Sequence, residues 1–164
     1  MRLLVENKLI SIGGGSVVKD EEGQVVYTIK GKWLSPTKKK IIKDAQGNKL
    51  FVVRNKWFNF LHHTAYIFNA EGESVGQIRK NKYSITNSFG AENFSEDYKI
   101  LGKFFSRKLD ISRNDKEYAV LTMEWSWFVD KYSIETNAVE DMPLLVAMVI
   151  AIDNVKDKRL NQES

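Results

Sequence analysis

Short stretches in which apolar and polar residues alternate recur along most of this chain. Gln24–Lys30 and Lys49–Arg54 are compact apolar segments of strand length. A period of two is typical of strands that present one face to a core. The positions that alternate in this way are Tyr83, Ile85 and Phe89, then Ala119, Leu121, Met123, Trp125 and Trp127, and finally Tyr132 and Ile134. The pattern therefore predicts a protein built mainly of β-strands.

Three similar tetrapeptides separate the strands of the first half. Asp20–Gly23, Asp44–Gly47 and Asn69–Gly72 each begin with Asp or Asn and end with Gly, at nearly equal spacing. Asp or Asn suits the first position of a type I turn, and Gly suits the position where φ becomes positive. Asn114–Glu117 is a fourth turn candidate that lacks the glycine. These turns predict successive antiparallel hairpins, since no helical stretch intervenes to return a parallel strand.

The pattern changes near the C-terminus, where Met142–Ile152 contains no polar residue. A helix that is apolar on all sides must be buried on all sides, in protein or in lipid. Eleven residues rise about 16 Å as a helix, whereas a bilayer core is about 30 Å thick. We therefore expect a helix at about 141–153 that plugs a closed barrel, in one domain over 1–155. Residues 156–164 are expected to form a short polar tail.

Two sets of segments carry a family resemblance. Near the C-terminus they are Asp130–Glu135, then Asp141 and Leu145–Asp153, and earlier in the chain they are Asp44–Arg54, Asn69–Arg79, Tyr98–Gly102 and Lys108–Ile111. The first set resembles the C-terminal signature of the LURP-one-related family, and the second resembles its hairpins. This family belongs to the tubby C-terminal-like superfamily, which also includes the phospholipid scramblases. The resemblance implies a mainly β fold, a closed antiparallel barrel of about twelve strands around a buried hydrophobic C-terminal helix. It implies less about function. Tubby-like relatives bind phosphoinositides and scramblases act on phospholipids, but many family members have no assigned activity.

The residue types most often used in catalysis are scarce. The chain has no cysteine and two histidines, His62 and His63. Neighbouring strand residues point to opposite faces, so these two cannot easily share a metal ion. Gly13–Ser16 lacks the Gly-Lys-Ser/Thr continuation of a phosphate-binding loop. We therefore expect no enzymatic activity, no metal and no cofactor.

Basic residues provide the most suggestive candidate site. The formal net charge is +4, and Lys38, Lys39, Lys40 and Lys43 lie close together after Pro36, a residue that favours an exposed turn. Lysines near an anionic membrane each contribute about 1 kcal/mol. These four lysines are the predicted ligand-binding residues, with anionic phospholipid or phosphoinositide headgroups as the ligand class.

The sequence thus predicts a non-enzymatic binding or scaffold module, cytoplasmic and peripheral to a membrane, with no transmembrane segment. Two alternatives stay open: a nucleic-acid-associated protein that uses the same basic loops, and a protein-interaction module without a small ligand. As the partner of the basic loops, we favour an anionic membrane surface over nucleic acid. The specific ligand and the oligomeric state do not follow from the sequence.

Overall fold

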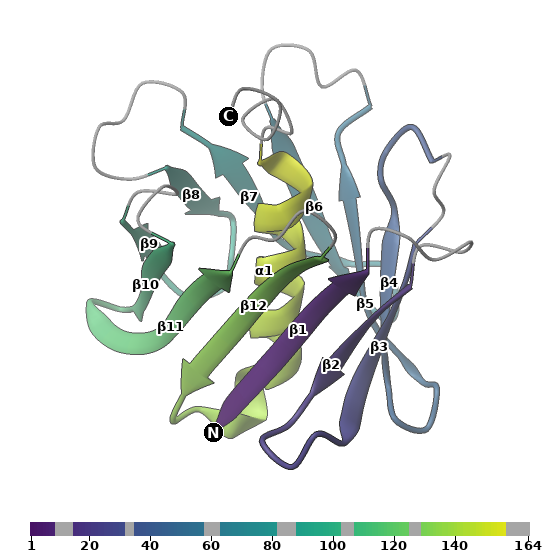
Figure 1. Cartoon of the computed structure of the whole chain (residues 1–164). Helices are drawn as coiled ribbons and strands as arrows, with labels where there is room; N and C mark the ends of the chain where they lie inside the picture. The colour runs from purple at the N-terminus through teal and green to yellow at the C-terminus, as the bar shows by residue number, and fades with distance from the viewer. Residues whose placement is uncertain are drawn as a thin grey trace, which may run out of the picture.

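The computed structural model describes residues 1–8, 15–31, 35–57, 63–81, 88–102, 107–124 and 129–156. Within these residues, twelve strands are followed by a short 3₁₀ helix and one α-helix (Figure 1). The strands are β1 (Arg2–Lys8), β2 (Gly15–Lys19), β3 (Val25–Gly31), β4 (Lys40–Asp44), β5 (Lys49–Asn55), β6 (Thr64–Asn69), β7 (Ser74–Lys80), β8 (Phe89–Glu92), β9 (Tyr98–Leu101), β10 (Lys108–Arg113), β11 (Lys116–Glu124) and β12 (Val129–Thr136). The helices are η2 (Val139–Asp141) and α1 (Met142–Val155).

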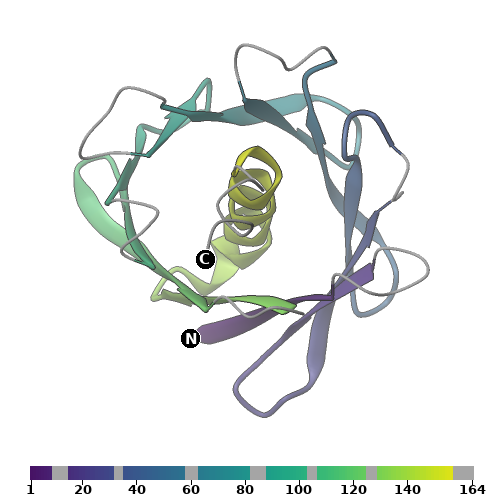
Figure 2. The same ribbon diagram turned by 45° about the horizontal axis from the view of Figure 1, so that its top comes forward.

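The strands form one antiparallel sheet that curls into a nearly closed barrel (Figure 2). Strands that are consecutive in the chain pair with each other except β8 and β9, and β1 also pairs with β12, with Leu3 opposite Ile134. The edges of the sheet are β8 and β9. A backbone hydrogen bond from Ser88 N to Gly102 O (3.2 Å) crosses the seam between them. The predicted antiparallel barrel of twelve strands is therefore confirmed.

The three predicted hairpin turns share one hydrogen-bonding scheme. Gly23, Gly47 and Gly72 have φ of 80°, 87° and 92°, which a side chain would disfavour. Each donates its backbone N–H to the carbonyl of the Asp or Asn that opens its turn, at 3.1–3.2 Å. That Asp or Asn also accepts from the N–H after the glycine, at 2.8 Å. A register shift in the flanking strands accompanies every turn, so a short sequence motif produces the same hairpin three times.

The fourth turn, between β10 and β11, solves the same problem without glycine. Asn114 and Asp115 have φ of 52° and 60°. Asn and Asp tolerate the left-handed region better than other non-glycine residues. Two successive residues with positive φ match the twist of a two-residue hairpin, which explains why the predicted turn forms here.

Helix α1 lies inside the ring of strands (Figure 2). Every side chain from Leu145 to Ile152 is fully buried. Inward residues such as Ile42, Val53, Ile67 and Ile78 belong to the same core. Burying one such aliphatic side chain contributes about 1.5–3 kcal/mol. The expectation that the apolar run is a helix buried by strands is thus confirmed.

The helix differs slightly from the expected boundaries. It spans Met142–Val155 rather than 141–153, with Pro143 in its first turn as expected. Lys156, which was assigned to the polar tail, packs against the barrel interior with a side chain only 13% exposed. Residues 157–164 lie outside the described residues, as do Trp125, Trp127, Tyr83 and Ile85. No helix in the described part of the chain is long and apolar enough to span a bilayer.

Candidate functional site

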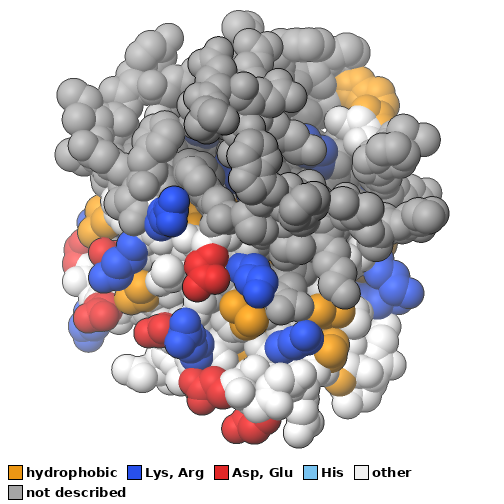
Figure 3. Space-filling view, in the orientation of Figure 1, with side chains coloured by type: hydrophobic (Ala, Val, Ile, Leu, Met, Phe, Trp, Pro, Cys, Tyr) orange, Lys and Arg blue, Asp and Glu red, His pale blue; other side chains and the backbone are white. Residues whose placement is uncertain are grey.

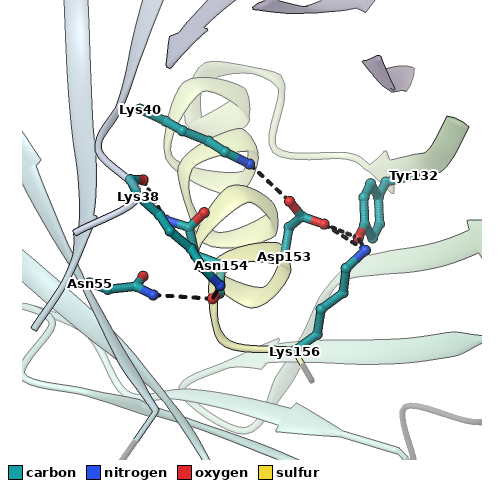
Figure 4. Close-up of polar contacts among 7 residues, drawn as sticks. All are labelled: Lys38, Lys40, Asn55, Tyr132, Asp153, Asn154 and Lys156. Carbon is teal, nitrogen blue, oxygen red and sulfur yellow. Dashed lines mark hydrogen bonds and ion pairs between the residues drawn. The ribbon is translucent and has the colours of Figure 1, made fainter. Parts of the chain in front are cut away.

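Polar side chains from several strands, from one connection and from the helix itself converge where α1 ends (Figure 4). We call these residues the helix-end network. Its members are Lys38, Lys40, Asn55, Tyr132, Asp153, Asn154 and Lys156. They come from the β3–β4 connection, β4, β5, β12 and the end of the helix. The network therefore fixes the β3–β4 connection to the end of the central helix.

The carboxylate of Asp153 is the centre of the network. One oxygen lies 2.9 Å from Lys40 Nζ, and the other lies 2.7 Å from Lys156 Nζ. Tyr132 donates its hydroxyl to the second oxygen at 2.5 Å, and Lys156 donates to the Tyr132 hydroxyl at 2.6 Å. The Asp153 side chain is only 8% exposed. Two ammonium groups and a phenol hydroxyl thus hold one buried carboxylate.

These partners keep Asp153 ionised in spite of its burial. Burial raises the pKa of the carboxyl group, but the charges of Lys40 and Lys156 lower it by more. The net pKa of Asp153 therefore lies well below the usual range of an aspartate. Donors of the same kind suit the oxygens of a phosphate group, since ammonium groups recognise both anions.

The neighbouring residue, Asn154, secures the β3–β4 connection. Lys38 Nζ and Asn55 Nδ2 both donate to the Asn154 carbonyl, at 3.0 and 3.2 Å. Asn154 Nδ2 donates in return to the carbonyl of Lys38 at 3.1 Å. Carbonyl groups in the last turn of a helix lack partners within the helix, and a cation there also complements the helix dipole. Lys38 therefore acts as a partner for the helix end in this structure.

The structure does not bring the four predicted lysines together as one patch. Lys38 and Lys40 donate to the helix end, Lys38 from an exposed position and Lys40 from a half-buried one, whereas the exposed Lys39 has no such contact. Lys43 lies on the outer wall, because its neighbour Ile42 faces the core and strand residues alternate. It is three residues further along β4 than Lys40, about 10 Å away.

Lys39 has a different set of neighbours from the one the sequence suggested. Asn55 N donates to Thr37 O at 2.7 Å, which places the end of β5 beside the β3–β4 connection. Lys56 and Trp57 follow directly, and the Trp57 side chain is 60% exposed. Among the described residues, neither Lys39 nor Lys56 forms an ion pair. We call this end of the barrel, with Lys38, Lys39, Lys40, Lys56, Trp57 and Lys156, the basic end.

The opposite end, where α1 begins, is acidic. Its turns carry Asp20, Glu21, Glu22, Asp44, Glu71, Glu73, Glu96, Asp97, Asp115, Glu140 and Asp141. An open hollow of about 890 Å³ at this end is lined in part by Glu21, Glu117, Glu135 and Glu140. Arg113 pairs with Asp141 at 2.6 Å and lies over the ring of Tyr118. We call this the acidic end. In the part of the chain that the structure describes, the two ends of the barrel thus differ in charge.

The wall between the two ends carries both charges. On the face shown in Figure 3, Lys and Arg side chains are interspersed with Asp and Glu in the described region. Arg2 and Glu135 form one exposed pair across β1 and β12, and Lys108 and Asp110 form another within β10. Neither charge dominates the described part of this face. The charge asymmetry of the described residues therefore lies between the two ends of the barrel.

That His62 and His63 do not share a metal ion stays a prediction. His62 lies outside the described residues, and His63 is half-buried and accepts a backbone hydrogen bond from Lys80 N at 2.9 Å. Within the described part of the chain, no group of three or more Asp, Glu or His side chains could hold a metal ion.

Comparisons with known proteins agree with this architecture. The family model of the LURP-one-related proteins matches residues 1–153. The chain is therefore an antiparallel β-barrel protein with a C-terminal helix, and it belongs to the LURP-one-related family. Among solved structures, a protein from Arabidopsis thaliana is similar with a TM-score of 0.54 and 11% sequence identity. The match covers 92% of this chain and 91% of that one, and at this identity it supports the fold alone. No curated protein sequence matches.

Proposed function

We propose that this protein is a non-enzymatic binding module that docks on anionic phospholipid through its basic end. The observation that carries the proposal is that the exposed Lys39, in the β3–β4 connection, and Lys56 and Trp57, which follow β5, lie at the same end of the barrel, where Asn55 N donates to Thr37 O. The clustered carboxylates lie at the opposite end of the barrel, which is the acidic end. An anionic surface attracts the first end and repels the second, so electrostatics orients the barrel end-on.

The contacting residues suit a lipid interface. Lysine contributes about 1 kcal/mol near an anionic surface, and the effect falls off within a Debye length of about 10 Å. Tryptophan favours the headgroup region because its ring is apolar and its N–H is polar. An exposed Trp57 flanked by lysine matches both requirements.

The proposed binding is weak and sensitive to salt. Lys38 and Lys40 are bonded to the helix end, whereas Lys39 and Lys56 are two lysines of the described basic end that form no ion pair there. Two lysines contribute about 2 kcal/mol, which alone is weaker than millimolar affinity. Trp57 insertion or several copies on one membrane would supply the remainder. The proposed place of action is the cytoplasmic face of a membrane, where anionic lipids are found.

Charge reversal at the basic end is expected to abolish co-sedimentation with anionic vesicles. Lys39→Glu/Lys56→Glu should lose most of the binding that the wild type shows to phosphatidylcholine vesicles containing phosphatidylserine, at low salt. Trp57→Ser should lower it several-fold. The physical reason is that four units of charge change at the surface that faces the lipid. A second set of vesicles containing a phosphoinositide distinguishes general charge from headgroup recognition.

The matched control reverses two exposed lysines near the acidic end, Lys49→Glu/Lys116→Glu. It changes the net charge equally, and we expect it to bind like the wild type. Equal loss in both double variants would show that net charge alone matters and would contradict an oriented contact. Absence of wild-type sedimentation, with retention of labelled oligonucleotides, would replace the lipid proposal with the nucleic-acid alternative.

A further inference from the structure

The helix-end network holds two lysines of the proposed lipid-binding end against an internal anion. Lys40 Nζ contacts the Asp153 carboxylate, and Lys38 Nζ contacts the Asn154 carbonyl. Both lysines lie beside Lys39. Lys38 and Lys39 are exposed, whereas Lys40 is half-buried with a side chain 18% exposed. Lys39 can therefore face a membrane in this structure while the ammonium groups of its two neighbours are bonded to the helix end.

Asp153 occupies a set of donors that would suit a lipid phosphate. Lys40, Lys156 and Tyr132 surround it with two ammonium groups and one hydroxyl. A phosphate group accepts hydrogen bonds from the same donors and carries at least the same charge. The carboxylate and an external phosphate would thus compete for the same cations.

Two hydrogen-bond acceptors of the helix-end network lack partners, which makes it easier for the network to release its lysines. Asn55 Oδ1 and Asn154 Oδ1 are buried, and neither accepts a hydrogen bond within the described residues. A buried acceptor without a partner is costly, so the polar junction is less stable than its number of contacts suggests. The helix itself is anchored before this point by the fully buried residues Leu145–Ile152, so the ion pairs of Asp153 can open without loss of the fold.

We propose that the helix-end network is an autoinhibitory latch, in which Asp153 competes with anionic headgroups for Lys40 and Asn154 restrains Lys38. This inference rests on the proposed lipid binding and adds its regulation. A lipid that binds more tightly to the state with free lysines shifts the protein toward that state. By thermodynamic linkage, the factor by which bound lipid favours opening equals the factor by which opening strengthens lipid binding. Release of two lysines is expected to strengthen binding about 30-fold, which corresponds to about 2 kcal/mol.

A double-mutant cycle between Asp153 and Lys40 tests the latch. Asp153→Asn should bind phosphatidylserine-containing vesicles about 10- to 30-fold more tightly than the wild type. Asp141→Asn is the matched control, since it removes the same charge at the acidic end, and it should bind like the wild type. Lys40→Gln should weaken binding of the Asp153→Asn variant several-fold more than it weakens binding of the wild type, because Asp153 competes for Lys40 only in the wild type.

The outcomes separate the latch from the proposed function. If Lys40→Gln weakens binding equally in both backgrounds, Lys40 is already available and the latch is wrong, while lipid binding stands. If no variant and no wild-type protein binds either vesicle, the proposed function and the latch are both wrong.

Hydrogen exchange of the wild type tests the latch without any substitution, in case Asp153→Asn fails to fold. On binding vesicles, the amide of Lys156, which donates to Ile152 O, should exchange faster, while amides of 145–149 stay protected. Unchanged exchange at Lys156 in the bound protein would overturn the latch.

Discussion

Replacing Val146 or Val149 with Asp is expected to unfold the domain. Both side chains are fully buried in α1, among apolar residues of the helix and the barrel. An uncompensated carboxylate in such a place costs several kcal/mol, and natural domains have only about 5–15 kcal/mol of stability. Thermal unfolding and soluble expression are the measurements, and we expect the cooperative transition and the soluble protein to be lost.

Val139→Asp is the control for this experiment, because Val139 lies just before the helix and its side chain is 49% exposed. It should retain the wild-type melting temperature within about 2 °C, as surface substitutions usually change stability by less than about 0.5 kcal/mol. If Val146→Asp or Val149→Asp melts like the wild type, the helix is not the buried centre of the barrel.

Replacing Asp153 with Asn is expected to lower the free energy of unfolding by about 3–5 kcal/mol at neutral pH. The change leaves the ammonium groups of Lys40 and Lys156 without their carboxylate, and breaking a buried pair in this way costs about that much. Such a loss corresponds to a fall of about 10 °C in melting temperature. Asp110→Asn is the control, because its pair with Lys108 is more than half exposed and contributes about 0–1 kcal/mol.

The difference in the free energy of unfolding between the wild type and Asp153→Asn is expected to depend on pH. The pKa of Asp153 is lower in the folded state than in the unfolded chain, where an aspartate titrates near about 4. Its contribution is therefore complete above about pH 4 and is lost as the pH falls toward the folded-state pKa. Denaturant unfolding should show the wild-type advantage over Asp153→Asn shrinking below about pH 4. An advantage that is constant down to pH 2 would contradict the ionised carboxylate.

Local chemistry explains which parts of the fold were predictable. The hairpins at Gly23, Gly47 and Gly72 follow from an Asp or Asn that accepts backbone hydrogen bonds and from a glycine that takes positive φ. Both properties belong to residues within one tetrapeptide. Burial of Met142–Ile152 followed in the same way, because a run that is apolar on every side has no other stable place in a strand-rich chain.

The helix-end network was not predictable, because it depends on how distant segments meet. Lys40 and Asp153 are joined only when β4 and the end of α1 share one end of the barrel. From sequence, Asp153 was a residue that ends an apolar run, and Lys156 was the start of a tail. A charged residue directly after a fully apolar helix was the available signal, since a carboxylate at the end of a buried helix needs cationic partners.

Four neighbouring lysines were treated as one patch for a related reason. Alternation along a strand sends Lys40 inward and Lys43 outward, but the β3–β4 connection breaks that alternation before Lys38, which has φ of 47°. Where β4 begins therefore decided which lysines face solvent. The placement of Lys39 at the same end of the barrel as Lys56 and Trp57 depends on the pairing of β4 with β5, which brings the β3–β4 connection next to the end of β5.

Site-specific labelling gives the most direct test of end-on binding to anionic lipid. The chain has no cysteine, so Lys39→Cys and Lys116→Cys each carry an environment-sensitive fluorophore at one position, one near each end of the barrel. With phosphatidylserine-containing vesicles, the label at position 39 should shift to the blue and gain intensity, while the label at 116 stays unchanged. A shift at position 116 alone, or equal shifts at both positions, would contradict docking through the basic end.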